Sequence, residues 1–110
     1  MYNPYEVAVS IIQEYIDECL FEPDATWPEY EFKTRCYERW AGEELMKRIT
    51  DESVLLPENI SGRRQKSPVK IIEGFIDDMD YHATTTDIQD HRFIFSIARD
   101  TAVDIIILFL

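Results

Sequence analysis

Apolar residues recur every three or four positions through most of this chain, which is the spacing of one buried face of an α-helix. At the start, Asn3 and Pro4 suit a helix N-cap and a first helical position, and Pro23 is a natural stop. The apolar stripe between them consists of Ala8, Ile11, Ile12, Tyr15, Ile16, Cys19 and Leu20. The pattern therefore predicts a first helix over residues 4–21.

A second helix is expected to begin at a capping box, in which Thr26 and Glu29 would each satisfy the backbone N–H group of the other. Apolar positions then continue at helical spacing to Ile49, which predicts a helix over residues 27–49. Gly42 lies in the middle of this segment, and it is expected to weaken the helix by about 1 kcal/mol relative to alanine.

Between the second and third helices, residues 54–56 are apolar and are expected to fold under the core, ahead of a polar connector. Ser67 and Pro68 then provide a cap and a first helical residue for another apolar stripe. The threonines at positions 84–86 would lose side-chain freedom in a helix, so they favour a loop or a cap. A third helix is therefore predicted over residues 68–83.

The last segment is rich in β-branched and aromatic residues, so a β-hairpin over residues 93–110 is one prediction. In strands, however, Arg99 would share a face with Phe95, and the alternation of apolar and polar residues would fail. In a helix, most polar residues of the segment fall within one arc of about 140°. We therefore favour a helix over residues 87–110 and keep the hairpin as the alternative. The candidate N-caps of this helix are Thr86 and Asp87.

Together these segments predict an all-α fold, a small four-helix bundle, with an α+β fold that ends in a hairpin as the alternative. The length of 110 residues suits a single helical domain over residues 1–110. With 45% apolar residues and 3 glycines, the chain is neither disordered nor fibrous. Because the C-terminal helix is the most apolar, we expect it to be the most buried helix, or to carry a self-association face beyond the core.

The two ends of the sequence favour a cytoplasmic location. The first residues have neither the basic region nor the apolar run of a secretory signal. The apolar C-terminal stretch is interrupted by Asp104 and is shorter than the roughly 20 residues that a membrane-spanning helix needs.

The cysteines, Cys19 and Cys36, are expected to be buried free thiols. If they lie on antiparallel helices joined near Pro23, their positions differ by about 9 Å along the helix axes. A disulfide needs Cα atoms within roughly 7 Å of each other. Cys19 has no basic residue or histidine beside it in sequence to stabilise a thiolate, and a nucleophilic role is not expected for either cysteine.

Charge is distributed unevenly along the chain, whose 22 acidic and 11 basic residues give a net charge of −11. This balance argues against direct binding to nucleic acid, because that affinity rests mainly on Lys and Arg. Eight acidic residues precede Lys33, the first basic residue, and six more lie between Ile71 and His91. A basic island separates these blocks and consists of Arg63, Arg64, Lys66 and Lys70.

Two interpretations of the acidic blocks remain open: solvated outer faces with weak ion pairs, or a surface that docks a basic partner. Aromatic residues at the start of the second helix support the second interpretation. Tyr37 and Trp40 are expected in the core. Trp27, Tyr30 and Phe32 diverge too far around the helix for all to be buried, so one or two of them are expected to be exposed. Exposed aromatics are typical of binding hot spots. The candidate partner-binding residues are Glu14, Asp17, Glu18, Glu22, Asp24, Trp27, Glu29, Tyr30, Glu31, Glu73, Asp77 and Asp80.

Metal chemistry is a weaker prediction. Glu73, Asp77 and Asp80 would stack on one helical face and could form half of a Mg²⁺ site, as in all-helical nucleotide hydrolases. They lie opposite the apolar stripe, however, so we expect them to face water. His82 and His91 lack the close ligand spacing of a zinc site, and cap or surface roles are favoured for them. We expect no metal, no cofactor and no catalytic residue.

The favoured function is a non-catalytic acidic interaction protein, an inhibitor or adaptor that docks a basic surface such as that of a nucleic-acid-binding protein. In gross character, being short, acidic and helical, the chain resembles small accessory proteins of phages and mobile elements, a class that includes anti-CRISPR proteins. This resemblance implies a counter-defence role and rests on no individual motif. The alternatives are a metal-dependent helical nucleotide hydrolase and a homo-oligomeric scaffold, with a homodimer formed through the C-terminal helix. Neither nucleic acid nor a membrane is expected as a direct partner.

Overall fold

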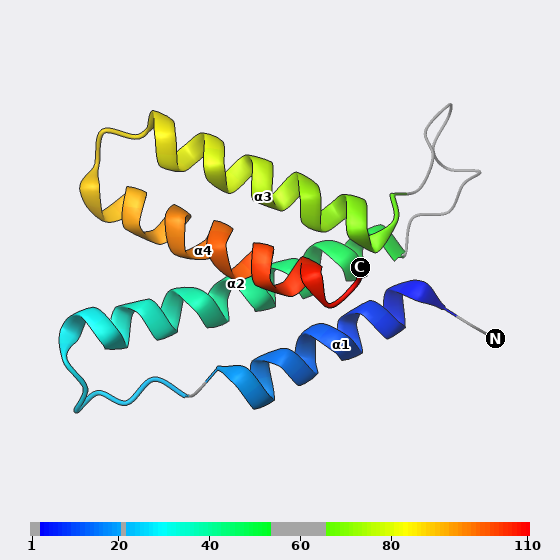
Figure 1. Cartoon of the computed structure of the whole chain (residues 1–110), viewed down its shortest axis with the longest axis horizontal. Coiled ribbons are helices and arrows are strands. Elements are labelled where there is room, and N and C mark those ends of the chain that lie inside the picture. Colours follow the sequence, from blue (N-terminus) through cyan, green and yellow to red (C-terminus); the bar gives the residue numbers. More distant parts are fainter. Residues whose placement is uncertain (1–2, 21, 54–65) are drawn as a thin grey trace.

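The computed structural model describes residues 3–20, 22–53 and 66–110, and within these ranges the regular secondary structure is entirely helical. The helices are α1 (Pro4–Cys19), α2 (Glu29–Ser53), α3 (Pro68–Thr85) and α4 (Gln89–Ile107) (Figure 1). The predicted all-α, four-helix fold is confirmed. The alternative of a hairpin over residues 93–110 is wrong, because this segment forms α4 and the turn that ends it.

The most extensive helix contacts are those of α4 with α3 and with α2, and α2 also packs closely against α1. In Figure 1, α3 and α4 run side by side, α2 passes behind α4, and α1 lies on the side away from α3. All the helices contribute to one hydrophobic core. Its largest fully buried side chains are Ile12, Ile16, Leu45, Ile49, Ile72, Phe75 and Ile105.

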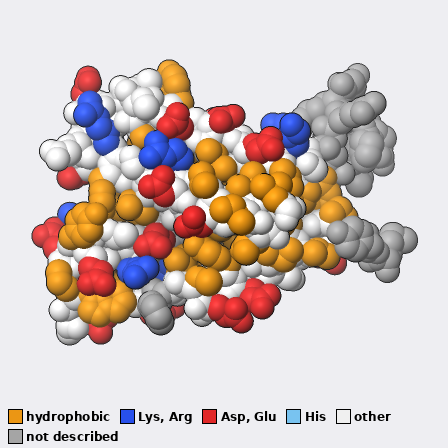
Figure 2. Space-filling model, viewed as in Figure 1, with side chains coloured by type: hydrophobic (Ala, Val, Ile, Leu, Met, Phe, Trp, Pro, Cys, Tyr) orange, Lys and Arg blue, Asp and Glu red, His pale blue; other side chains and the backbone are white. Residues whose placement is uncertain are grey.

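The prediction that the C-terminal helix would be the most buried is wrong. Six residues of α3 are buried, compared with four of α4. Because α4 packs mainly against α3 and α2, it turns one stripe toward the core, which includes Ala98, Ala102 and Ile105. Its other apolar residues stay near the surface, and Figure 2 shows hydrophobic side chains gathered over the C-terminal half of α4 and the adjoining parts of α1 and α3.

Side-chain caps define the start of two helices, as the sequence predicts. The Asn3 Oδ1 atom accepts hydrogen bonds from the backbone N–H groups of Tyr5 at 2.9 Å and Glu6 at 3.3 Å. Ser67 Oγ accepts from the backbone N–H of Lys70 at 3.3 Å. These bonds satisfy N–H groups that have no partner within the first helical turn, so α1 and α3 begin where expected.

The start and end predicted for the second helix need correction. Thr26 does not cap α2, because its backbone N–H and its hydroxyl both donate to the carboxylate of Asp24 in a tight turn, at 2.9 and 2.8 Å. The helix begins instead at Glu29, where the carbonyl of Pro28 accepts from Phe32 N at 3.0 Å. It then continues to Ser53, past the predicted end at residue 49.

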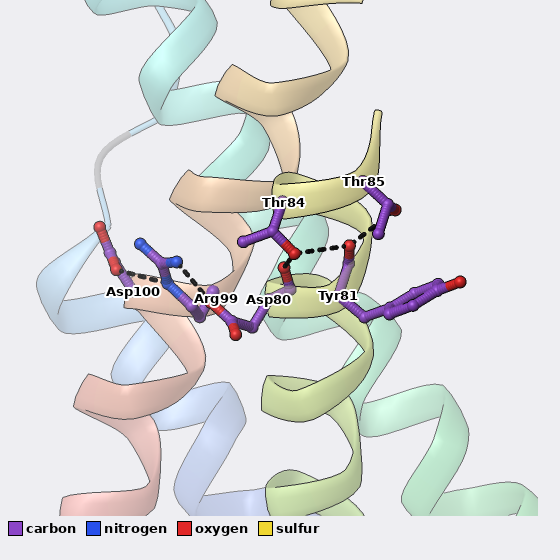
Figure 3. A network of polar contacts seen from close by, with 6 residues as sticks. All are labelled: Asp80, Tyr81, Thr84, Thr85, Arg99 and Asp100. Atoms are coloured by element: carbon purple, nitrogen blue, oxygen red, sulfur yellow. Dashed lines mark hydrogen bonds and ion pairs between the residues drawn. The ribbon is translucent and has the colours of Figure 1, made fainter. Parts of the chain in front are cut away.

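The threonines that were expected to end the third helix instead form its last turn. Thr84 Oγ1 donates to the backbone carbonyls of Asp80 at 3.0 Å and Tyr81 at 3.1 Å, and Thr85 Oγ1 donates to that of Tyr81 at 2.8 Å (Figure 3). A threonine hydroxyl can bond to a carbonyl three or four residues earlier, which compensates for low helix propensity. As a result α3 extends to Thr85.

The fourth helix begins without the expected side-chain cap. Its N-cap is Ile88, which makes no side-chain capping bond, and the helix starts at Gln89 rather than residue 87. Thr86 stabilises the connection in another way: its hydroxyl accepts from Ile88 N at 3.3 Å, and its carbonyl accepts from Arg92 Nε at 2.8 Å. The proposed caps Thr86 and Asp87 are therefore wrong for this helix.

Close packing of α1 against α2 depends on Gly42. This residue is buried, and a Cβ atom added there would lie 2.7 Å from Ile16 Cδ1 and 2.9 Å from Ile16 Cγ1. The glycine that weakens α2 locally therefore allows the two helices to approach each other, a role that the sequence pattern did not indicate.

Some predictions fall outside the described residues, namely the apolar turn at residues 54–56 and the basic side chains of Arg63 and Arg64. No helix among the described residues combines the length and the apolar character that crossing a bilayer requires.

Candidate functional site

The predicted acidic residues do not form one continuous surface. Glu14, Asp17 and Glu18 are exposed on α1, whereas Glu73, Asp77 and Asp80 are exposed on α3. The two helices lie on opposite sides of the view in Figure 1. The remaining candidates belong to the α1–α2 connection and the first turn of α2. A partner that contacts all of these residues at once would have to surround the bundle.

Several of these carboxylates already have partners within the chain. Asp80 Oδ1 lies 2.8 Å from Arg99 Nη1, which connects α3 to α4, and Arg99 also contacts Asp100 (Figure 3). On α3 itself, Glu73 pairs with Lys70 at 3.5 Å. Exposed pairs of this kind contribute about 0–1 kcal/mol each, so these contacts fit the interpretation of α3 as a solvated face.

Near the start of α2, two further carboxylates are also held locally. Glu29 lies 2.9 Å from Lys33 Nζ, and this hydrogen bond and charge lower the pKa of the glutamate and raise that of the lysine. Hydrogen bonds from Thr26 lower the pKa of Asp24. The Asp24 carboxylate therefore serves to form the turn, while Glu22 pairs with Arg39 across the connection at 3.1 Å.

The residues considered for metal binding do not come as close together as the ligands of a metal site. Among the described residues, no three His, Cys, Asp or Glu side chains come together in a group that could hold an ion. Instead His82 and His91 both lie against the ring of Phe95, with ring centroids 5.1 and 6.3 Å away. The α3 carboxylates point away from the core, as their position opposite the apolar stripe predicts.

The aromatic candidates occupy one end of the bundle, where α2 and α4 both begin (Figure 1). The ring of Tyr30 lies 5.3 Å from that of Phe93, and Tyr37 packs edge-on against the same phenylalanine at 5.7 Å. A hollow of about 390 Å³ adjoins this cluster. We call its lining the Tyr30–Phe93 surface, which consists of Glu29, Tyr30, Lys33, Gln89, Asp90 and Phe93.

The prediction for the core aromatics is partly wrong. Tyr37 is half-buried, but Trp40 is 39% exposed and covers the ring of Phe75 with a centroid distance of 6.4 Å. Trp27 and Phe32 are half-buried, whereas Tyr30 is 71% exposed. The expectation that one or two of these aromatics would be exposed is thus confirmed. Tyr30 is the exposed ring that belongs to a hollow with carboxylates on its rim.

No protein-family model, curated protein or solved structure matches this chain. Its function therefore has to be argued from the chemistry of its own surface. On that basis the Tyr30–Phe93 surface is the strongest candidate, since it joins an exposed aromatic ring, a hollow and acidic side chains from two helices.

The sequence prediction missed four members of this surface: Lys33, Gln89, Asp90 and Phe93. Asp90 and Phe93 are far along the chain from Tyr30, and nothing in the spacing of residues indicates that the starts of α2 and α4 meet. In the sequence, Phe93 is the first residue of the apolar and aromatic segment within the last predicted helix. The one sequence signal that could have drawn attention to it is its place near the start of that helix, before the core stripe at Ala98 begins.

The cysteines are free, as predicted, but Cys19 is exposed and Cys36 is half-buried. The expectation that both would be buried is therefore wrong for Cys19. It is the last residue of α1, and Leu20, which follows it, closes the buried stripe in its place.

A second polar cluster lies where α1, α2 and α4 adjoin, and its centre is Glu38. The side chain of Glu38 is 18% exposed and lies 3.4 Å from Arg35 Nη1. Burial raises the pKa of Glu38, and the nearby Asp104 adds to this effect, while Arg35 opposes it. Burial and Asp104 also raise the pKa of Tyr15 on α1. The charged form of Glu38 is thus less favourable in the folded chain than in water.

This arrangement predicts that Glu38→Gln will raise the melting temperature slightly at pH 7. The folded chain holds the Glu38 proton to a higher pH than the unfolded chain does. The stability that the protonated side chain contributes is therefore complete below the unfolded pKa, and it is lost as the pH rises through the folded pKa. The advantage of the glutamine variant should therefore vanish below the ordinary glutamate pKa. Thermal unfolding across the acid range would measure it, with Glu18→Gln on the exposed face of α1 as the control. A glutamine variant that is less stable at pH 7 would contradict the prediction.

Proposed function

We propose that this chain is a non-catalytic interaction protein that docks a basic protein surface, as an inhibitor or an adaptor. The observation that carries the proposal is Tyr30, which is 71% exposed although its ring rests against Phe93. A ring that is held in place and open to solvent resembles the aromatic anchors of protein interfaces, which supply contact area at a small cost in conformational entropy.

The charges around Tyr30 support a basic partner. Glu29 and Asp90 line the hollow, Glu31 is exposed in the same first turn of α2, and Lys33 is already paired with Glu29. The net charge of −11 adds an attractive field for a cationic surface, which would accelerate association. The carboxylates of α1 and α3 lie elsewhere on the bundle and would contribute to this field without touching the partner.

An inhibitor of a nucleic-acid-binding enzyme is our favoured form of the proposal. Spaced carboxylates can compete with phosphates for a groove rich in Lys and Arg. The general likeness to small accessory proteins of phages and mobile elements supports a counter-defence role, although it rests on size, charge and helical content rather than on any residue.

Affinity capture from the native host, with the wild-type chain and the Tyr30→Ala variant, tests this proposal. We expect the variant to lose at least about tenfold in affinity for the captured protein, since truncating a central interface aromatic commonly costs about 2 kcal/mol or more. Binding should also weaken strongly as the salt concentration is raised to 1 M, where the Debye length is about 3 Å.

Tyr81→Ala is a matched control, because Tyr81 is also an exposed tyrosine, at 64%, and lies against an aromatic neighbour, His82, on a different helix. It should leave binding unchanged. A captured protein whose affinity responds neither to Tyr30→Ala nor to salt would contradict the proposed site and its electrostatic basis.

A further inference from the structure

The C-terminal half of α4 carries an apolar surface that no other part of the described chain covers. Ile107 is 59% exposed, and the last residue, Leu110, is 89% exposed. We call this surface the α4 apolar face, which consists of Val103 and Ile107 on α4 and of Leu108 and Leu110 in the turn that ends the helix and the residue after it. Figure 2 shows hydrophobic side chains gathered in this part of the molecule. Contiguous apolar patches of this kind are typical of interaction sites, whereas single exposed apolar residues are ordinary.

The helix geometry explains why the bundle cannot bury this face. Val103 and Ile107 are separated by four positions, and so they share one side of α4. The core side is defined by Ala98, Ala102 and Ile105, which lies roughly opposite. Because both sides cannot face α3 and α2 at once, Val103 and Ile107 stay exposed within the described part of the chain.

The border of this face is acidic. Asp100 and Asp104 belong to α4 itself and are exposed, and Asp104 lies close enough to α1 to raise the pKa of Tyr15. Arg99 also belongs to α4, one turn before Val103, and its positive charge is offset by pairs with Asp80 at 2.8 Å and with Asp100 at 3.2 Å. In Figure 2 acidic side chains also flank the apolar area on its two long sides.

We infer that the α4 apolar face binds an amphipathic helix whose apolar stripe is bordered by Lys and Arg residues. Apolar anchors at i, i+3, i+4 and i+7 of such a helix would cover Val103 and Ile107, as in other complexes in which a helix binds an apolar surface. Its basic residues would oppose Asp100 and Asp104. The inference rests on the proposed function, because it takes the partner to be basic. The surface involved is nevertheless separate from the Tyr30–Phe93 surface.

Charge complementarity favours this occupant over a second copy of the chain. A symmetric dimer through α4 would bring identical acidic borders together, because the same surface patch contributes from both subunits. Each copy also carries a net charge of −11. Like charges placed against each other across an interface oppose binding.

Titration with a labelled synthetic peptide tests the inference. The probe is a helical peptide of about 18 residues, with leucines at i, i+3, i+4 and i+7 and lysines elsewhere, and its partner probe has glutamate in place of lysine. We expect fluorescence anisotropy to show binding of the lysine peptide and at least tenfold weaker binding of the glutamate peptide. Ile107→Glu should weaken binding of the lysine peptide at least tenfold.

The sign of the Ile107→Glu effect is informative, because the added negative charge by itself would strengthen the attraction for lysine. Weaker binding therefore reports the loss of apolar contact. Leu110→Ser, at a more exposed position, should also weaken binding without affecting the fold. Asp104→Asn should weaken binding a few fold, whereas Asp87→Asn, at an exposed position before α4, should not.

Three results would overturn the inference: equal binding of the two peptides, no effect of Ile107→Glu or Leu110→Ser, or a concentration-dependent dimer in sedimentation that Ile107→Glu dissociates. The last result would assign the face to a second copy. Tyr30→Ala should leave peptide binding unchanged. If this variant loses peptide binding, the peptide does not bind at α4 alone and the inference about α4 fails. If host-protein capture fails while the peptide still binds, the proposal for the Tyr30–Phe93 surface fails and the inference about α4 stands.

Discussion

Phe75→Ala should lower the free energy of unfolding by about 3–5 kcal/mol, the cost of removing a large aromatic side chain from a packed core. Phe75 is fully buried on α3, where its ring packs 6.4 Å from that of Trp40 and lies beneath the guanidinium of Arg48 at 4.9 Å. The substitution removes these two contacts of Phe75 with α2 and leaves a cavity in the core. Because small domains are stable by about 5–15 kcal/mol, much of the stability would be lost.

Urea denaturation followed by circular dichroism measures this effect, with Tyr81→Ala as the control. Tyr81 also lies on α3 but is exposed, so its replacement should change stability by no more than about 0.5 kcal/mol. If Phe75→Ala cost less than about 1 kcal/mol, the described packing of α2 against α3 would be wrong.

Gly42→Ala and Gly74→Ala should have opposite effects on stability, although both place a methyl group in the middle of a helix. At Gly74 the added Cβ would meet nothing within 4 Å, so the higher helix propensity of alanine should stabilise the protein by about 0.5–1 kcal/mol. At Gly42 the Cβ would lie 2.7 Å from a side-chain carbon of Ile16, which is itself buried. Moving Ile16 within a close-packed core should cost about 1–3 kcal/mol and exceed the gain in propensity.

Melting temperatures of the two variants provide the comparison, since each serves as the control for the other. Combining Gly42→Ala with Ile16→Val should relieve part of the clash, because a valine lacks the terminal Cδ1 atom that approaches most closely. A Gly42→Ala variant as stable as Gly74→Ala would show that α1 and α2 do not need a glycine to approach each other.

Local patterns were sufficient to predict most of the secondary structure. Apolar spacing located each helix, and Asn3 and Ser67 cap α1 and α3 as expected. The errors occur where a polar side chain has more than one possible partner. Thr26 forms a turn with Asp24 instead of capping α2, and Thr84 extends α3 instead of ending it. Sequence does not indicate which of these competing hydrogen bonds is formed.

The candidate sites were harder to predict, because each depends on which helices lie next to each other. Tyr30 and Glu29 were identified from sequence, but Phe93 and Asp90 join them only because α2 and α4 begin at the same end of the bundle. Likewise, the apolar character of α4 predicted burial, whereas α3 and α2, the main neighbours of α4, leave Ile107 exposed. Residue type does not specify how many sides of a helix will be covered.

The amino-acid sequence by itself determined the helical class, the approximate helix positions, the acidic character and the apolar stripe that each helix turns inward. These properties depend on interactions between residues three or four positions apart, which any helix brings together. Only the tertiary structure decided that the acidic residues separate onto different faces, that Gly42 lies against Ile16, and that Tyr30 and Ile107 stay exposed. Those outcomes depend on contacts between residues distant in sequence, which form when the hydrophobic core selects one arrangement of the four helices.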